Sequence, residues 1–234
     1  MATTVTAVAH RGDPYRVREN TIPSIRSALA QGADAVEIDV RVTRDGVPVL
    51  LHDATLKRLW GHDLRLDRLT RAELTGLTRG GVPTLREALL AAGTHRVMID
   101  LPGSTDGSVA RTVAAVHGCG AAERVYYCAG PEAMLRVRAA DPAAEIALTW
   151  TSPEPPGPAL LDAVRPRWLN YRFGLVHREL TDRLHRDGLL VSAWTVDTAP
   201  VMRRLVRRGV DSITTNRVDV LRGVLANSSA TGPA

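Results

Sequence analysis

The sequence predicts an α/β protein that folds as a single (β/α)8 barrel of the TIM-barrel type. Short β-branched apolar runs alternate with longer amphipathic stretches almost from end to end, and this alternation requires a largely parallel sheet covered by helices. Nine candidate strands occur where a closed barrel of this type needs eight, so one strand is expected outside the alternation. No glycine-rich phosphate loop follows the first candidate strand, which disfavours the alternative, an open doubly wound sheet.

Each predicted strand is a short run of β-branched, aliphatic or aromatic residues bounded by turn residues. In chain order the predicted strands are 6–10, 35–40, 47–52, 96–101, 124–129, 145–150, 167–172, 189–196 and 212–216.

The stretches between the strands carry helix signals. Helical patterns occur in "IPSIRSALAQG", "TLREALLAAG", "PEAMLRVRAADP" and "APVMRRLVRRG". Three of them close on a glycine, the usual residue just past a helix C-terminus, and Pro83 with Thr84 and Pro131 with Glu132 mark helix starts. We predict one domain over residues 1–226 and a disordered tail over residues 227–234.

Composition narrows the class of protein. A chain of 234 residues buries a sizeable core without disulfides, and two cysteines, Cys119 and Cys128, are too few for a disulfide framework. The N-terminus lacks a basic stretch followed by an apolar one, and no apolar run approaches the roughly 18 residues that span a bilayer. We therefore expect a cytoplasmic protein without a transmembrane segment. The charge of +5 is spread along the chain and aromatic residues are only 4%, so no nucleic-acid partner is expected.

The stretch "VEIDVRVTRDGVPVLLHD", residues 36–53, carries the first functional signal. Its Asp-Gly pair predicts a two-residue hairpin turn, and that register sets Val40 opposite Leu51 and Asp39 opposite His52. Glu37 shares the face of Asp39, because side chains alternate along a strand.

Two carboxylates held this close repel each other unless a proton or cation lies between them. Oxygen ligands favour Mg²⁺ or Ca²⁺ over zinc. The alternative reading is a solvent-facing side of an edge hairpin, which needs no metal. Residues at other strand ends favour the metal-binding interpretation. His10 and Arg11 end the first strand, Asp100 ends the fourth, and Trp194 lies in the eighth. In a (β/α)8 barrel the C-terminal ends of the strands converge on one mouth, where active sites lie.

The motifs "AHRG", "ENT", "EID", "HD", "WTVD" and "GVDSITTN" occur in this order along nearly the whole chain. In order and spacing they resemble the glycerophosphodiester phosphodiesterase family. The resemblance implies a barrel of the phospholipase-C-like phosphodiesterase architecture. It also implies an enzyme that uses a divalent cation to cleave glycerophosphodiesters to glycerol 3-phosphate and an alcohol.

Position by position, the resemblance implies that Glu37 and Asp39 are metal ligands and that His10 and His52 are the acid/base pair. One histidine would take a proton from the attacking oxygen and the other would protonate the leaving alkoxide, tasks that suit a group titrating near neutral pH. Our hypothesis is that the glycerol 2-hydroxyl attacks first and that water then opens the cyclic phosphate.

The resemblance also assigns substrate-binding positions. Arg11 is expected to contact the phosphate, Glu19 and Asn20 form the "ENT" element near the site, and Trp194 is expected to line the pocket.

The fourth strand departs from the family pattern, which commonly reads Glu-x-Lys, with the glutamate completing the metal site and the lysine facing the phosphate. Here Asp100 is the expected third metal ligand and Pro102 replaces the lysine. Arg41 and Arg172 are the candidates to substitute for it. The departure leaves two alternatives: a diesterase for another substrate, such as a lysophospholipid head group, or a non-catalytic barrel that binds a phosphate ligand.

Overall fold

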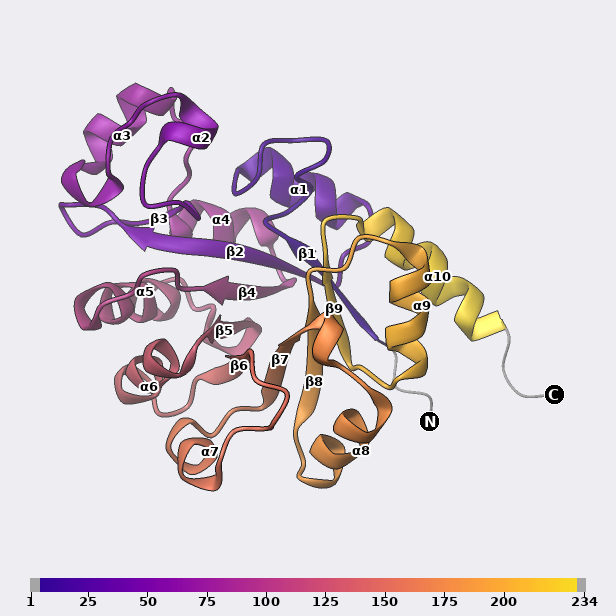
Figure 1. Cartoon of the computed structure of the whole chain (residues 1–234). Helices are drawn as coiled ribbons and strands as arrows, with labels where there is room; N and C mark the ends of the chain where they lie inside the picture. The colour runs from indigo at the N-terminus through magenta and orange to yellow at the C-terminus, as the bar shows by residue number, and fades with distance from the viewer. Residues whose placement is uncertain (1–4, 231–234) are drawn as a thin grey trace.

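Eight parallel strands form a closed ring in the computed structural model, which describes residues 5–230 (Figure 1). The ring closes because β1 pairs with both β9 and β2. The predicted barrel is confirmed, and each predicted strand exists. The bounds of the ring strands are β1 Thr6–His10, β2 Ala35–Val42, β4 Arg96–Asp100, β5 Val125–Ala129, β6 Glu145–Trp150, β7 Trp168–Arg172, β8 Leu190–Trp194 and β9 Ser212–Thr215.

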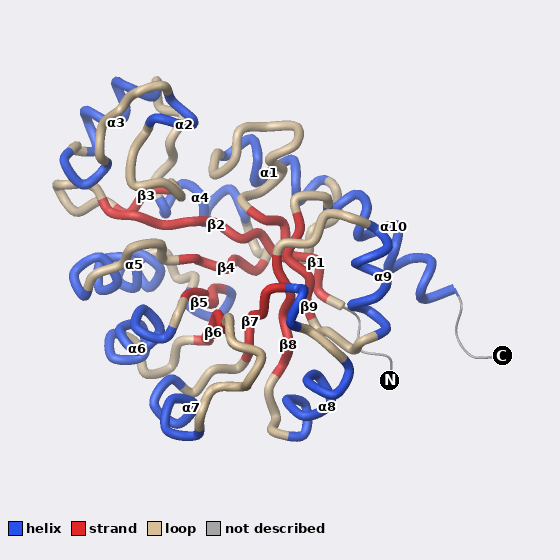
Figure 2. Tube along the Cα trace, in the orientation of Figure 1, coloured by secondary structure: helices blue, strands red, loops and turns tan. Residues whose placement is uncertain are grey.

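Helices surround the ring on its outer side (Figure 2). Their bounds are α1 Ile22–Ala30, α4 Leu85–Ala92, α5 Asp106–Gly118, α6 Pro131–Ala140, α7 Pro158–Val164, α8 Arg178–Arg186, α9 Ala199–Arg207 and α10 Val218–Ala230. Short 3₁₀ turns η2 (Ala122–Arg124) and η3 (Phe173–Leu175) lie between elements. Because α10 continues to Ala230, residues 227–230 of the tail that we predicted as disordered are helical. Residues 231–234 lie outside the described part.

The helix starts follow the predicted signals. Thr84 caps α4 in a reciprocal capping box, in which its side chain accepts from the Glu87 backbone and the Glu87 carboxylate accepts from the Thr84 backbone. Pro131 occupies the first turn of α6, where its missing N–H is not needed.

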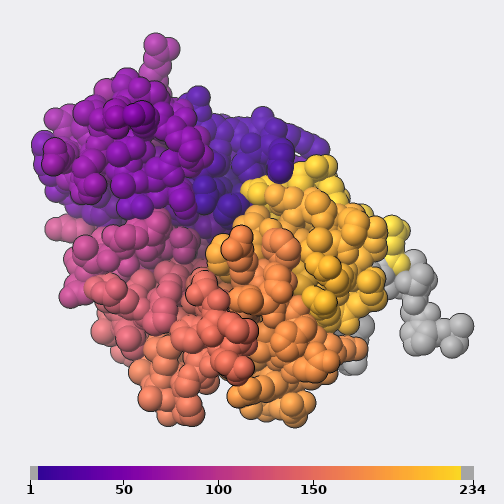
Figure 3. Space-filling model, viewed as in Figure 1, coloured from indigo at the N-terminus to yellow at the C-terminus, as the bar shows by residue number. Residues whose placement is uncertain are grey.

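The strand outside the ring is β3 (Pro48–Leu50), which pairs antiparallel with β2. It begins an insertion that contains α2 (Lys57–Trp60), η1 (Leu66–Arg68) and α3 (Arg71–Thr78). The insertion has an apolar cluster of its own, and it forms the purple mass on one side of the barrel (Figure 3). The buried residues of this cluster are Val49, Leu51, Leu56, Leu66, Leu69, Leu74 and Val82.

The hairpin register that we predicted is wrong by one residue. Val40 pairs with Leu50, and the Thr43 backbone N–H donates to the Val47 carbonyl across a three-residue turn that ends on Gly46 with φ of +87°. This is the hairpin form in which a glycine in the left-handed region makes a bulge. His52 therefore follows the end of β3 and does not pair with Asp39.

Apolar side chains fill two layers. The larger cluster lies between the ring and its helices and includes Val36, Ile38 and Tyr127. A smaller cluster lies inside the ring, where Tyr126 stacks on Trp168 with ring centroids 6.2 Å apart. This inner cluster fills part of the barrel interior. Among the described helices, none is long and apolar enough to cross a membrane.

Candidate active site

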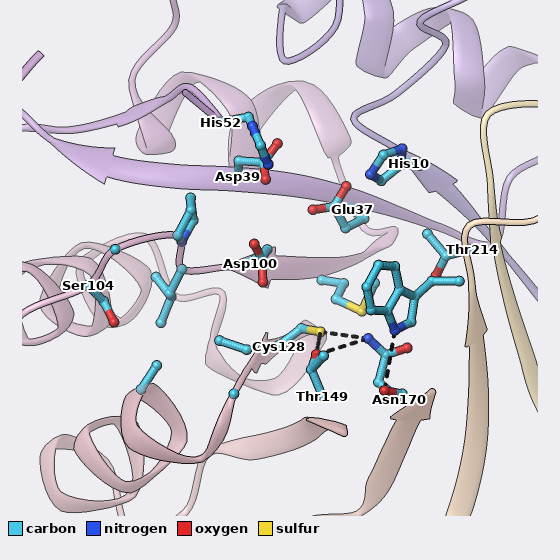
Figure 4. Close-up of a pocket in the computed structure, with 18 of the residues that line it drawn as sticks. His10, Glu37, Asp39, His52, Asp100, Ser104, Cys128, Thr149, Asn170 and Thr214 are labelled. Atoms are coloured by element: carbon cyan, nitrogen blue, oxygen red, sulfur yellow. Dashed lines mark hydrogen bonds between the residues drawn. The ribbon is translucent and has the colours of Figure 1, made fainter. Parts of the chain in front are cut away.

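A cavity of about 630 Å³ opens at the C-terminal ends of the ring strands (Figure 4). Seven of the nine predicted site residues line it. They are His10, Arg11, Glu37, Asp39, His52, Asp100 and Trp194. The two predicted residues that do not line the cavity are Glu19 and Asn20.

Strand pairing explains why the carboxylates meet. Glu37 and Asp39 alternate with Val36 and Ile38, which face the outer apolar layer, so both acids face the barrel interior. In the parallel register Asp39 is adjacent to Asp100 on β4. Three carboxylates from two neighbouring strands therefore lie on one wall of the cavity (Figure 4).

This wall makes ionisation of Glu37 and Asp100 unfavourable. Burial raises the pKa of the Glu37 carboxyl well above its usual range, and the nearby Asp39 and Asp100 carboxylates raise it further. Burial, followed by the charge of Asp39, raises the pKa of Asp100 to about 7. A neighbouring positive charge would offset this repulsion.

Arg11 supplies part of that charge. Its backbone N–H donates to Oε2 of Glu37 at 2.9 Å, and its Nε lies 3.1 Å from Oδ2 of Asp39. Asn20 is 2% exposed and fixes Asp39 from behind, because its Nδ2 donates to Oδ2 at 2.6 Å and its Oδ1 accepts from the Asp39 backbone at 3.1 Å. Asn20 therefore positions Asp39 and does not reach the cavity as a substrate-binding group.

The acid wall fits a hard divalent cation in the chemistry of its donors, since Glu37, Asp39 and Asp100 offer only carboxylate oxygens. The pKa values of Glu37 and Asp100 are raised first by burial and then by neighbouring carboxylates, and a cation at the wall would offset both effects. Among the described residues, no three acidic, histidine or cysteine side chains lie close enough together to coordinate an ion in their present positions.

His10 is held by a hydrogen-bonded relay that the sequence reasoning missed. The backbone and side-chain amide of Asn216 both donate to Asp197, at 2.9 and 2.8 Å. Because its Nδ2 is used in this way, Oδ1 of Asn216 accepts from Nδ1–H of His10 at 2.8 Å. The relay leaves Nε2 of His10 with a free electron pair, which is the form that accepts a proton.

Burial lowers the pKa of His10, and the Arg11 guanidinium lowers it further. The imidazole is therefore neutral near neutral pH.

His52 is oriented by its chain neighbour. Its Nδ1 lies 2.7 Å from Oδ1 of Asp53, which can only accept when ionised. Arg58 holds Asp53 through Nε, at 2.6 Å, and holds both oxygens of Glu19, at 2.8 and 3.0 Å. Glu19 in turn accepts from Nη1 of Arg11 at 2.9 Å.

This chain of ion pairs joins the insertion to the first loop of the barrel. Glu19, predicted to bind substrate, is placed behind Arg11 and Arg58 and serves to position them. Arg58 was not predicted, because its exposed helix carries no signal of its own.

The opposite wall of the cavity is neutral and polar. Asn170 Nδ2 donates to Cys128 Sγ at 3.0 Å and to Thr149 Oγ1 at 3.2 Å, and its backbone carbonyl accepts from the indole N–H of Trp194 at 3.3 Å (Figure 4). Trp194 thus lines the cavity as predicted and is fixed in place by Asn170. Cys119, which is half-buried, and Cys128, which is buried, are both free thiols.

Neither Arg41 nor Arg172 takes the position of the family's lysine. Pro102 lines the cavity, whereas Arg41 turns into a neighbouring groove and donates through Nε to the His52 carbonyl at 2.8 Å. Arg172 is exposed at the end of β7 and is not among the lining residues. Both proposed substitutions are therefore unsupported, whereas Arg11 lies within ion-pair distance of Asp39 on the acid wall.

Comparisons with known proteins agree with this geometry. The sequence profile of the glycerophosphoryl diester phosphodiesterase family matches residues 10–220. The chain is 34% identical over 242 residues to a Mycobacterium tuberculosis protein predicted to be glycerophosphodiester phosphodiesterase 2, covering 94% of this chain and 90% of that one.

Solved structures are also similar. A predicted glycerophosphoryl diester phosphodiesterase from Silicibacter pomeroyi superposes with a TM-score of 0.86 at 25% identity, covering 98% of this chain and 95% of that one. A phosphodiesterase from Oleispira antarctica, solved with the product sn-glycerol-3-phosphate, superposes with a TM-score of 0.85 at 20% identity, covering 94% and 96%.

Proposed function

The chain belongs to the glycerophosphoryl diester phosphodiesterase family and is a phosphoric diester hydrolase, and from this premise we propose how its cavity cleaves a glycerophosphodiester. The proposed products are glycerol 3-phosphate and an alcohol. The observation that carries the proposal is the arrangement of His10 and His52 beside one wall of three carboxylates and Arg11 in a single cavity.

The phosphate would lie against Arg11. A guanidinium binds phosphate oxygens in a fixed fork geometry, and Arg11 is held by Asp39 and Glu19. As phosphorus is attacked, negative charge accumulates on its outer oxygens, and a positive group already in place stabilises that charge without rearranging.

A divalent cation, Mg²⁺ or Ca²⁺, would be held by Glu37, Asp39 and Asp100. When bound, it would supply a further positive charge for the phosphate oxygens. The support for this assignment is the donor chemistry of the wall and the raised pKa of Glu37 and Asp100.

The two histidines would divide the proton transfers. His10 is the proposed base, because its Nδ1 is occupied by Asn216 and its imidazole is neutral. It takes the proton of the glycerol 2-hydroxyl, the oxygen forms a bond to phosphorus, and the bond to the alcohol breaks. His52, oriented by Asp53, gives a proton to the departing alkoxide.

The cyclic phosphate would then be opened by water with the roles reversed. His52 takes a proton from water and the water oxygen forms a bond to phosphorus. The bond between phosphorus and the glycerol 2-oxygen breaks, and His10 returns its proton to that oxygen. Glycerol 3-phosphate leaves, and both histidines regain their starting states.

The test is hydrolysis of a small panel of glycerophosphodiesters and lysophosphatidylcholine, with and without EDTA. His10→Ala and His52→Ala are each expected to lower kcat by about 100-fold or more, since each removes a proton-transfer step. His117→Ala is the matched control, because His117 is exposed and pairs with Asp141 outside the cavity.

Losses below about tenfold in both histidine variants would contradict the assigned roles. Ligand binding with no turnover at any divalent cation would instead identify a non-catalytic barrel. Full activity on a 2-deoxy analogue would rule out attack by the 2-hydroxyl.

A further inference from the structure

A second groove, of about 400 Å³, adjoins the active-site cavity. The two hollows share Pro102, Gly103 and Ser104, the loop that joins β4 to α5. The groove continues between the β2–β3 hairpin and the first turn of α5. A ligand that extends from the acid wall across this loop therefore enters the groove.

The groove is strongly basic. Four arginines line it, Arg41, Arg44, Arg65 and Arg111, against one acidic residue, Asp67. Arg65 pairs with Asp67, and Arg44 pairs with Glu73 at 3.3 Å. The lining residues alone thus carry an excess of positive charge.

Arg41 and Arg111 have no carboxylate partner within ion-pair distance among the described residues. Arg41 donates to the His52 carbonyl and lies against Gly103, where a β-carbon would stand 3.2 Å from Nη1. The Arg111 guanidinium lies so close to Gly46 that a β-carbon there would collide with it. Both guanidinium groups therefore lie in the groove without a carboxylate at ion-pair distance, and Arg41 is also held by the backbone.

Helix α5 adds to the field. Its thirteen residues begin at Asp106, and Thr105, Gly107 and Ser108 of its first turn line the groove. The N-terminus of a helix carries partial positive charge. The arginines and the helix end thus act on the same volume.

We propose that this groove binds a second phosphate, carried by the alcohol portion of the diester. The inference rests on the proposed function, which places the scissile phosphate at the acid wall. Guanidinium forks match phosphate oxygens, whereas a choline or a neutral alcohol would leave the excess charge of the groove unpaired. The preferred substrates are then glycerophosphodiesters whose alcohol is itself phosphorylated.

The test compares two substrates that differ by one phosphate-linked group, 1,3-bis(glycerophospho)glycerol and glycerophosphoglycerol. We expect the wild-type enzyme to prefer the bis compound in kcat/KM, counted per scissile bond, by about threefold or more at low salt. The preference should decrease as ionic strength rises, because exposed charges are screened.

Arg111→Gln should remove most of this preference while leaving kcat/KM for glycerophosphoglycerol unchanged, since Arg111 does not line the active-site cavity. Asp67→Asn should increase the preference, because it frees Arg65. Arg203→Gln, an exposed arginine on α9, is the control for the same change of net charge and should have no effect.

Equal kcat/KM values for the two substrates, or a preference unchanged in Arg111→Gln, would overturn the inference and leave the proposed function intact. The inference would also be overturned if inorganic phosphate altered the turnover of both substrates equally and if this effect required Arg111. The groove would then bind a free effector. Failure to hydrolyse either compound would instead count against the proposed function.

Discussion

Asn216 has no acid–base chemistry of its own, yet it controls the state of His10, the proposed base. Its amide is fixed by Asp197, so its oxygen accepts from His10 and sets which ring nitrogen carries the proton. The sequence reasoning placed Asn216 at the end of the last strand but assigned it no role. The available signal was its place at a strand end, where side chains converge on the mouth of the barrel.

Asn216→Ala should lower kcat/KM for glycerophosphocholine by about tenfold, because His10 is no longer held in one tautomer. The hydrogen bond that His10 donates to Asn216 raises the pKa of His10, so its loss lowers that pKa. A base with a lower pKa stays unprotonated to lower pH, and the acid limb of the kcat/KM profile should move to lower pH.

The full pH profile of kcat/KM for the two proteins is the measurement. Ser212→Ala, on the same strand and outside the cavity lining, is the control. An acid limb that stays in place, or that moves to higher pH, would refute the relay.

At the scale of single elements, sequence predicted each strand of the ring because burial on both faces leaves a continuous apolar run. The prediction from sequence was wrong at the hairpin, because an Asp-Gly pair is compatible with more than one type of turn. Thr43 decides the outcome, because its Oγ1 bonds both Asp45, at 2.6 Å, and the Val47 backbone, at 3.0 Å. Asp45 also accepts a hydrogen bond from the backbone N–H of Arg71 in the insertion. The local sequence pattern could not predict this long-range contact.

The exit from β1 depends on Gly12. Its φ is +85°, and a β-carbon there would meet the Ser24 carbonyl carbon at 2.6 Å and its oxygen at 2.8 Å. Gly12→Ala should therefore lower the free energy of unfolding by about 3 kcal/mol and displace Arg11, because a left-handed conformation and a backbone clash add together.

Gly76→Ala is the matched control. Gly76 lies within α3 with open space around it, so alanine there should raise the free energy of unfolding by about 0.5–1 kcal/mol. Urea unfolding of the two variants measures both. Equal effects at the two positions would show that the close approach of Gly12 to Ser24 is not a constraint.

At the scale of the whole molecule, the contacts that complete the site join distant parts of the chain. Arg58 of the insertion reaches Glu19 of the first loop across 39 positions of sequence. The family motifs predicted which residues line the cavity, since strand order and alternation place them there. The supporting pairs around Arg58 depend on how the insertion docks, which no local pattern contains.

The acid wall links stability to pH. The pKa of Asp100 is about 7 in the folded protein, above the ordinary value of 3.8 for an aspartate. The folded state therefore binds the extra proton between these values, and the stabilisation is lost as pH rises through about 7. In EDTA, the Tm should fall between about pH 5.5 and pH 8, and added Ca²⁺ or Mg²⁺ should raise it most at the higher pH.

Asp100→Asn should show a smaller fall in Tm across the same interval, because it removes this titration. Thermal unfolding of both proteins, with and without cation, is the measurement. A cation-induced rise in Tm that is larger at the lower pH would contradict this account.

The central claim is that the three carboxylates hold one cation beside the histidine pair. Calorimetric titration of the metal-free protein with Ca²⁺ and with Mg²⁺ tests it most directly. We predict that one of these ions binds at one per chain, that Glu37→Gln abolishes this binding and that His10→Ala retains it. Unchanged binding to Glu37→Gln, or no binding by a wild-type protein that hydrolyses its substrate in EDTA, would contradict the claim.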